Sequence, residues 1–174
     1  MINASILEAA ILRRLPATAR VLPFQRHHAV VMRHDSFQQS LIARIPDYLD
    51  RLEAQAAAGA GFTILEHGRV MAIFGVTPVI PLVVEAWMMR DCDIAERGKP
   101  TAVVSRYFFN ALDTATAVRR CQLTVECSNL GALRYAEWLG FNREGVMRAF
   151  GKTDSYMMSR LYGRRILGSE TSTS

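Results

Sequence analysis

The sequence predicts a single α/β domain with a mixed central sheet of about six or seven strands and helices on both faces. Three observations predict it. The chain has 174 residues, of which 50% are apolar and 21% charged, as is typical of one globular domain. Segments with the two-residue period of a strand alternate with segments of helical period. The predicted order is β, α(α), β, β, β, α, β, α, β, β, a mixed sheet with helices on both faces, and the crossovers that contain the helices over 99–117 and 129–139 are expected to be right-handed where they join parallel strands.

The first half of the pattern is mainly helical. Residues 28–33, HAVVMR, are the expected first strand. Residues 35–61 then carry apolar side chains at helical spacing. Pro46 is expected to split this segment into two helices, and Gly59 to end the second.

After this segment the period changes to that of strands. Residues 62–76 contain two β-rich runs around a His-Gly pair, which predicts a hairpin. Residues 80–89 are mostly apolar, as expected for a strand at the centre of a sheet. The remaining expected elements are a helix over 99–117, a strand over 119–127, a helix over 129–139, and strands over 144–150 and 155–162.

The domain organisation follows from these elements. Residues 1–167 are expected to form one domain, in which residues 28–162 hold the patterned elements. Residues 1–27 are expected to be a helical extension, with a short helix over 4–14. The polar tail, residues 168–174, is predicted to be disordered.

Charge and cysteine content limit the partners and the compartment. The net charge is +5 and the basic doublets are dispersed, so nucleic acid is not an expected partner. Cys92, Cys121 and Cys127 form no C-x-x-C pair, which fits a reducing compartment without disulfides. The amino terminus places Glu8 before its arginines, opposite to a signal peptide, and no apolar run of about 18 residues predicts a membrane span. We therefore expect a cytoplasmic protein with no membrane partner.

The sequence lacks the common motifs of metal sites and of several enzyme classes. The four histidines lack the HExxH or mixed Cys/His spacing of metal sites. The sequence also has no GxSxG nucleophile pattern, Walker A loop or Rossmann glycine pattern.

The stretch NLGALRYAEWLGFNREGVMRAF, residues 129–150, is the most regular in the chain. Asn129 is a favourable helix N-cap. Alanines and a leucine then recur at i, i+4 and i+7, Gly140 can adopt the left-handed conformation that ends a helix, and Phe141 returns to the core. These features predict a stable helix followed by a strand without invoking any ligand.

The element order and this stretch together resemble the GNAT superfamily of acetyl-CoA-dependent N-acetyltransferases, over residues 28–162. The motif positions are Asn129, Ala132, Leu133, Gly140 and Phe141. The resemblance implies that the helix borders the pantetheine arm of coenzyme A and that Asn129 contacts it. It also implies contacts to this arm along the central strand, at Trp87, Met88 and Met89.

The loop that holds the diphosphate in such proteins departs from the family pattern. The corresponding stretch is RGKPTA, and the resemblance implies that the cofactor is held by Arg97, Gly98, Lys99, Thr101 and Ala102. Pro100 has no N–H group, and one lost hydrogen bond to a charged group costs roughly 1.5–3 kcal/mol. Alternatively, Pro100 simply starts a helix, where proline is favoured. The expected cofactor is thus acetyl-CoA, with binding retained, weakened or lost.

The acid position is the second departure. Many GNAT enzymes have a tyrosine seven residues after the motif asparagine, but this chain has Ala136 there. Tyr135 is one residue early, about 100° around the helix. Tyr135, Cys127, another hydroxyl or solvent remain candidates to protonate the departing thiolate.

The base is expected on the central strands. Glu85 lies within an otherwise apolar strand and is the first candidate, and Glu126 on the neighbouring strand is the second. A glutamate in such a place needs either a structural partner or a function, and both interpretations stay open.

Two functions are compatible with the sequence. The first is an N-acetyltransferase that moves an acetyl group from acetyl-CoA to an amine, on a small molecule or a protein N-terminus, by direct attack. The alternative is a GNAT-fold protein that has lost catalysis and serves as a structural or binding module. A looser resemblance, to GNAT-like proteins of tailed phages of the internal virion or head-assembly type, favours the alternative. It implies a virion or host-cytoplasm location, with virion proteins or a second copy as partners.

Overall fold

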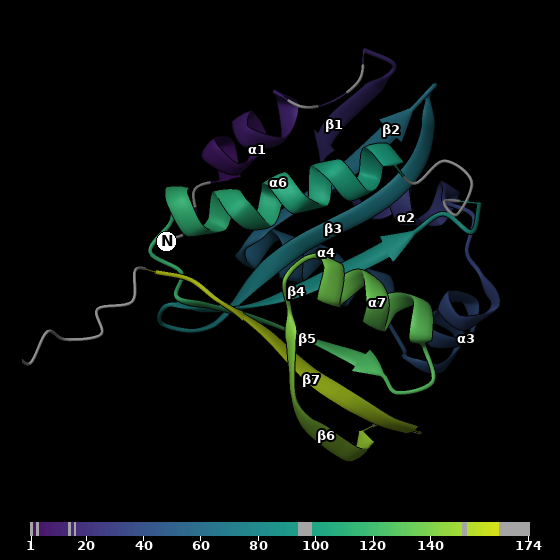
Figure 1. Ribbon diagram of the computed structural model, residues 1–174. Helices are drawn as coiled ribbons and strands as arrows, with labels where there is room; N and C mark the ends of the chain where they lie inside the picture. The colour runs from purple at the N-terminus through teal and green to yellow at the C-terminus, as the bar shows by residue number, and fades with distance from the viewer. Residues whose placement is uncertain are drawn as a thin grey trace, which may run out of the picture.

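The computed structural model describes residues 2, 4–13, 15, 17–93, 99–150 and 153–163. These residues form a seven-stranded sheet in the order β1-β2-β3-β4-β5-β7-β6 (Figure 1). The strands are β1 (Ala19–Pro23), β2 (Ala60–Glu66), β3 (Arg69–Ile80), β4 (Val83–Arg90), β5 (Arg120–Glu126), β6 (Asn142–Phe150) and β7 (Thr153–Leu161). Neighbouring strands are antiparallel except β4 and β5, which are parallel. The predicted mixed α/β sheet is confirmed.

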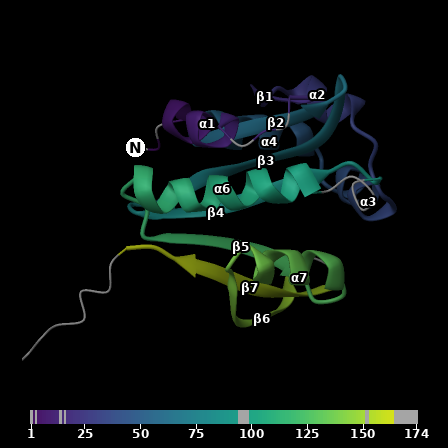
Figure 2. The ribbon, with the colours of Figure 1, turned by 45° about the horizontal axis from the view of Figure 1, so that its top comes forward.

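Helices cover both faces of this sheet (Figures 1 and 2). One face carries α1 (Ala4–Leu12), α6 (Lys99–Ala115) and α7 (Leu130–Trp138), and the other carries α2 (Arg26–Val31), α3 (Ser36–Arg44) and α4 (Tyr48–Ala58). We call these the α6/α7 face and the α2/α4 face. Each face has its own cluster of buried side chains. Within the described residues, no helix is both long and apolar enough to cross a membrane.

A chain of aromatic rings links the elements on the α6/α7 face. The rings of Phe62, Phe74, Phe108, Phe109 and Phe141 contact one another in succession, with centroids 5.1 to 6.1 Å apart. Most of these pairs are edge-to-face, the arrangement that aromatic quadrupoles favour. The ring that follows α7 is therefore part of the same core as β2, β3 and α6.

The predicted first strand over 28–33 is wrong. These residues lie mainly in α2. The first strand is instead β1, which comes earlier in the chain and pairs with β2. Ala29 and Met32 are buried, whereas Val30 and Val31 are 56% and 66% exposed. Burial at i and i+3 is the spacing of a helix. A short apolar run does not distinguish helix from strand, and here the tertiary contacts decide.

The other expected elements are confirmed with small shifts. The helical segment is split at Pro46, because α3 ends at Arg44 and α4 begins at Tyr48. The hairpin over 62–76 corresponds to β2 and β3, although β3 continues to Ile80 before β4 begins.

The motif helix also forms as predicted. The Oδ1 atom of Asn129 accepts a hydrogen bond from the backbone N–H of Ala132 at 3.0 Å. Gly140 ends α7 with φ +90, a conformation that favours glycine. Phe141 is 2% exposed, so the chain returns to the core at the predicted position.

Candidate functional site

The parallel pairing between β4 and β5 is short. It consists of three bridges, of which Glu85 with Gln122 is the last. Beyond this bridge the two strands diverge (Figure 1). We call the two limbs that no longer pair with each other, residues 86–90 of β4 and 123–126 of β5, the fork. Residues 86–90 still pair with β3 on their other side, so their remaining N–H and C=O groups are available to a ligand along the fork.

Side chains of β4 alternate between the two faces. Ala86 and Met88 pack against the core of the α6/α7 face. Trp87 and Met89 belong to the cluster of the α2/α4 face. The predicted cofactor contacts at residues 87–89 thus lie on the fork. Their side chains point to opposite faces of the sheet, so a ligand along the fork would contact all three residues through their backbone.

Glu85 lies at the base of the fork. Alternation along β4 places its side chain on the α2/α4 face together with Trp87. The side chain is exposed, and among the described residues no hydrogen bond or ion pair engages its carboxylate. The glutamate therefore has no structural partner in this part of the chain and is available to a ligand.

Arg120 is close to Glu85 in the sheet but is already paired. Its guanidinium donates to the two Glu144 oxygens at 2.7 and 2.5 Å and to Gln122 at 3.1 Å. Ser159 also donates to Glu144, at 2.6 Å. The hydrogen bonds from Arg120 and Ser159 lower the pKa of Glu144 to about 2. Because Arg120 is engaged in this bidentate pair, it leaves the charge of Glu85 uncompensated.

Glu126, the second predicted base, is differently placed. Its carboxylate accepts hydrogen bonds from Thr153 at 2.7 Å and from Ser128 at 3.4 Å. These contacts connect the end of β5 to the start of β7. Glu126 is thus engaged in holding the hairpin, whereas Glu85 is free.

Trp87 forms a wall of the α2/α4 face. Its indole lies over Gly75 on β3, where an added Cβ would come within 2.4 Å of the ring. The ring of Phe24 contacts the indole in an edge-to-face arrangement with a centroid distance of 5.8 Å. Its Nε1 donates to the hydroxyl of Thr77 at 3.2 Å. The indole is therefore fixed beside the base of the fork.

Tyr135 points from α7 toward α6. Its ring stacks on Trp138 at a centroid distance of 6.0 Å. Burial raises the pKa of Tyr135, an effect that the neighbouring Ser105 hydroxyl and the charge of Arg90 oppose. Tyr135 is therefore a neutral phenol at physiological pH. Ala136, at the motif position for the acid, is 3% exposed and faces the core.

The helix starts lie at the open end of the fork. Both α6 and α7 begin where β4 and β5 end (Figure 1). Free N–H groups and the helix dipole at the start of α6 favour an anion there. Helix α6 includes Pro100 in its first turn and a buried Thr101, followed by Ala102. The predicted diphosphate residues Arg97 and Gly98 lie outside the described residues, and Lys99 is described only as the first residue of α6.

Asn129 retains one free group. Its Oδ1 is used by the N-cap hydrogen bond to Ala132. Among the described residues its Nδ2 group makes no hydrogen bond, so it can still donate to an acceptor at the open end of the fork.

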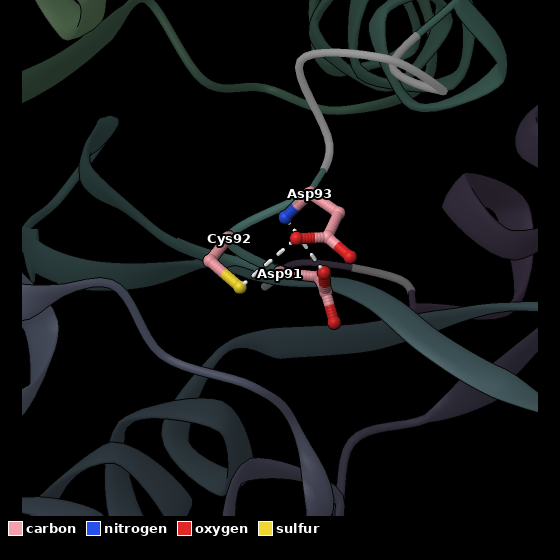
Figure 3. Close-up of side chains that lie close together, drawn as sticks. All are labelled: Asp91, Cys92 and Asp93. Carbon is pink, nitrogen blue, oxygen red and sulfur yellow. Dashed lines mark hydrogen bonds between the residues drawn. The ribbon is translucent and has the colours of Figure 1, made fainter.

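A cluster of acidic residues follows β4, formed by Asp91, Cys92 and Asp93 (Figure 3). The buried Asp91 carboxylate accepts from Arg69 at 2.9 and 3.0 Å and from the Asp93 backbone at 2.9 Å. Arg33 forms ion pairs with both aspartates. Two guanidinium groups thus balance two carboxylates, and the cluster holds the end of β4 against β3 and the segment that follows α2 instead of presenting free ligands to a cation.

A scan against protein-family models and a search of curated proteins gave no match to this sequence. Solved structures do match. The GNAT-family acetyltransferase from Streptococcus pneumoniae has a TM-score of 0.64 and 17% identity, covering 83% of this chain and 99% of that chain. The ribosomal-protein-S18-alanine N-acetyltransferase from Escherichia coli has a TM-score of 0.65 and 16% identity, covering 89% and 99%. A ribosomal L7/L12 α-N-protein acetyltransferase in complex with coenzyme A has a TM-score of 0.61 and 11% identity, covering 85% and 96%.

These similarities establish the fold. The chain has the architecture of GNAT acetyltransferases over most of its length, as the motif from Asn129 onward predicts. At this level of identity they show no activity, so the chemistry has to be argued from the residues of the fork.

Proposed function

We propose that this protein is an acetyl-CoA-dependent N-acetyltransferase that acts on an amine. The observation that carries the proposal is the fork itself. It opens a parallel pair of strands in the middle of the sheet, and a carboxylate without a partner, Glu85, lies at its base. An unpaired strand backbone suits an extended amide-containing chain, and a free carboxylate suits an ammonium group.

The residues along the fork fit acetyl-CoA as the acyl donor. Residues 86–90 have no partner on β5, so alternate residues along Trp87, Met88 and Met89 direct their backbone N–H and C=O groups to that side, and the Asn129 Nδ2 group is a further donor. Two buried hydroxyls on the α6/α7 face, of Tyr135 and Ser105, have no hydrogen-bond partner among the described residues. Orphaned buried donors of this kind are uncommon and are often satisfied by a ligand or water.

The diphosphate is assigned to the start of α6. Thr101 and Ala102 lie in its first turn, where backbone N–H groups favour an anion. The sequence places Arg97, Gly98 and Lys99 shortly before them. These three residues, together with Thr101 and Ala102, are the proposed diphosphate contacts. Pro100 withholds one N–H from this site, so the proposal includes a lower affinity than an unbroken loop would give.

Glu85 performs the proton transfer in the proposed reaction. An acceptor ammonium reaches it from the α2/α4 face, beside the wall formed by Trp87, and gives up a proton to the carboxylate. When bound, acetyl-CoA supplies a thioester whose carbonyl carbon bonds to the amine nitrogen as its carbon–sulfur bond breaks. The nitrogen then loses a second proton. Of the two protons released, one neutralises the departing thiolate and one goes to solvent.

A second group of the chain protonates the departing thiolate in the proposed reaction. Tyr135 is protonated and lies on the α6/α7 face, so it remains the proposed acid. Glu126 remains the second proposed base, although its carboxylate is already hydrogen-bonded.

Calorimetric titration with acetyl-CoA, followed by thiol release in the presence of small amines and of peptides with a free amino terminus, tests the proposal. We expect saturable binding and amine-dependent thiol release. Glu85→Gln should bind acetyl-CoA normally and lose turnover, while Glu66→Gln, a control in β2 away from the fork, should keep both. If millimolar acetyl-CoA gives no binding signal, the proposal is wrong.

One observation favours a second candidate, a GNAT-fold module without catalysis. The motif position of the acid is a buried alanine, Ala136, that contacts the core. Such a module would serve as a binding or structural protein, and the looser phage resemblance points to a virion or head-assembly role. Acetyl-CoA binding without transfer to any amine would favour this candidate over the enzyme.

A further inference from the structure

Side chains connect α6 and α7 across the fork. Arg106 of α6 lies over the ring of Trp138 of α7, 5.5 Å from its centroid. The other partner of Trp138 is Tyr135, whose ring is tilted by only 19° from it. The Tyr135 hydroxyl is directed toward Ser105 of α6, and the charge of Arg90 at the end of β4 acts on it. The two helices are thus joined by a stack of three side chains, Arg106, Trp138 and Tyr135, beside which the hydroxyls of Tyr135 and Ser105 face each other.

This arrangement places Tyr135 over the open part of the fork. Helix α6 and helix α7 lie on the same face of the sheet, one on each side of the divergence between β4 and β5 (Figure 2). A side chain that starts on α7 and ends beside Ser105 of α6 has to cross that divergence. Its ring also packs against the buried core of this face. Tyr135 therefore occupies the route from the α6/α7 side to the backbone of residues 86–90.

The hydroxyls of this bridge are not satisfied. Both Tyr135 and Ser105 have buried oxygens without a hydrogen-bond partner in the described part of the chain, although they face each other. Ser105 is 1% exposed, so water does not readily replace the missing partner. Unpaired buried hydroxyls raise the free energy of the state that buries them. This cost falls when Tyr135 swings out or when a polar ligand enters.

We propose that Tyr135 is a gate on the cofactor side of the fork, closed in this structure, which has to swing away before the pantetheine arm of an acyl-CoA reaches residues 86–90. This inference rests on the proposed acetyl-CoA site and adds its regulation. The closed position of Tyr135 is stabilised by stacking on Trp138, which is 47% exposed. Among the described residues its hydroxyl makes no hydrogen bond that would stabilise this position further. A weakly held side chain of this kind gives a closed state that ligand can displace.

The gate predicts an unusual direction of effect. If only the open state binds acyl-CoA, the apparent affinity is reduced by the fraction of molecules that are open. Removing the ring with Tyr135→Ala should therefore tighten acetyl-CoA binding, by about tenfold if about a tenth of the molecules are open. A residue that merely contacts the cofactor would show the opposite change.

Calorimetric titration of acetyl-CoA into the full chain tests the gate with three variants. Tyr135→Ala and Trp138→Ala should both bind more tightly than the original protein, the second because the gate loses its stacking partner. Tyr135→Phe is the matched control: it keeps the ring and removes only the unsatisfied hydroxyl, so the gate stays closed and this variant should bind no more tightly than the original protein. Trp138→Ala changes a half-exposed side chain and keeps the test available if Tyr135→Ala does not fold.

A second readout follows the gate directly. The chain has two tryptophans, so the difference in emission between the original protein and Trp138→Phe reports on Trp138 while Trp87 stays in place. Acetyl-CoA should change this difference in the original protein and should not do so when Tyr135→Ala is added. If the original protein binds acetyl-CoA and Tyr135→Ala binds equally or more weakly, the gate is wrong while the proposed function stands. If neither the original protein nor any variant binds, both are wrong.

Discussion

Glu85 of β4 and Gln122 of β5 form the last parallel bridge between the two central strands. Every residue of β4 beyond this bridge keeps its partner on β3 and has none on β5. The carboxylate of Glu85 is therefore exposed at the point where the sheet opens, on the α2/α4 face, while the residues that suit an acyl-CoA lie on the α6/α7 face. In the proposed reaction, the acceptor amine thus reaches Glu85 from one side of the sheet, and the acyl donor binds from the other side.

This separation predicts how Glu85→Gln should behave. The change keeps the shape of the side chain and removes its ability to accept a proton. We expect kcat for amine acetylation to fall about a hundredfold, the usual contribution of a general base, while the dissociation constant of acetyl-CoA stays the same. Steady-state kinetics and calorimetry measure the two effects. Glu126→Gln is the comparison, and a larger loss of kcat there would transfer the role of base to Glu126.

The pair formed by Arg120 and Glu144 predicts a pH dependence of stability. Arg120 and Ser159 lower the pKa of Glu144 from 4.5 to about 2. A carboxylate whose pKa is lower in the folded state stabilises the fold above its unfolded pKa, and this contribution is lost as the pH falls from about 4.5 to about 2. The side chain is 39% exposed, so solvent screening limits the effect to about 0.5–1 kcal/mol.

Urea unfolding at a series of pH values checks this prediction. Glu144→Gln should lower the free energy of unfolding at pH 7 and match the original protein near pH 2. Ser159→Ala removes one hydrogen bond and keeps the ion pair, so its loss should be smaller over the same pH range. A Glu144→Gln deficit that does not change with pH would show that the charge of Glu144 contributes nothing.

Replacing the buried Asp91 should lower the stability of the fold, and this loss should not depend on a metal ion. Asp91→Ala removes the buried carboxylate that accepts from Arg69 and pairs with Arg33, while both half-exposed guanidinium groups keep Asp93, so the expected cost is about 1.5–3 kcal/mol. Asp93→Ala is the control, since its side chain is 46% exposed, and its loss should be smaller. Thermal unfolding with and without a chelator separates the interpretations. A fall in Tm on chelation alone would mean that the acidic cluster holds a cation.

Local signals explain what the sequence predicts well. The N-cap of Asn129 and the helix end at Gly140 depend on contacts within a few residues, so their residue types are sufficient to place them. The split at Pro46 is local for the same reason. The strand expected over 28–33 fails because its run of apolar residues is too short to define a period, and packing against β3 and α4 selects the helix.

The side-chain partners in the site depend on contacts that no local pattern contains. Glu144 meets Arg120 because the register of β6 shifts between Arg143 and Gly145, and a period of two residues does not predict a bulge. Tyr135 meets Ser105 only through the relative placement of α6 and α7. The candidate base Glu85 could be named from the sequence, because a glutamate within an apolar strand is conspicuous. That its carboxylate has no partner among the described residues could be seen only in the structure.

Gly75 gives the last prediction, because the indole of Trp87 lies where its side chain would be. An added Cβ would lie 2.2 Å from the Ala60 carbonyl oxygen and 2.4 Å from the Trp87 ring. Gly75→Ala therefore forces both the β2–β3 pairing and the indole to move, which should lower the free energy of unfolding by about 3 kcal/mol. Gly145→Ala is the matched control, since nothing lies within 4 Å of its added Cβ. Urea unfolding followed by tryptophan emission measures both changes, and equal stability of the two variants would contradict the close packing of Trp87 on β3.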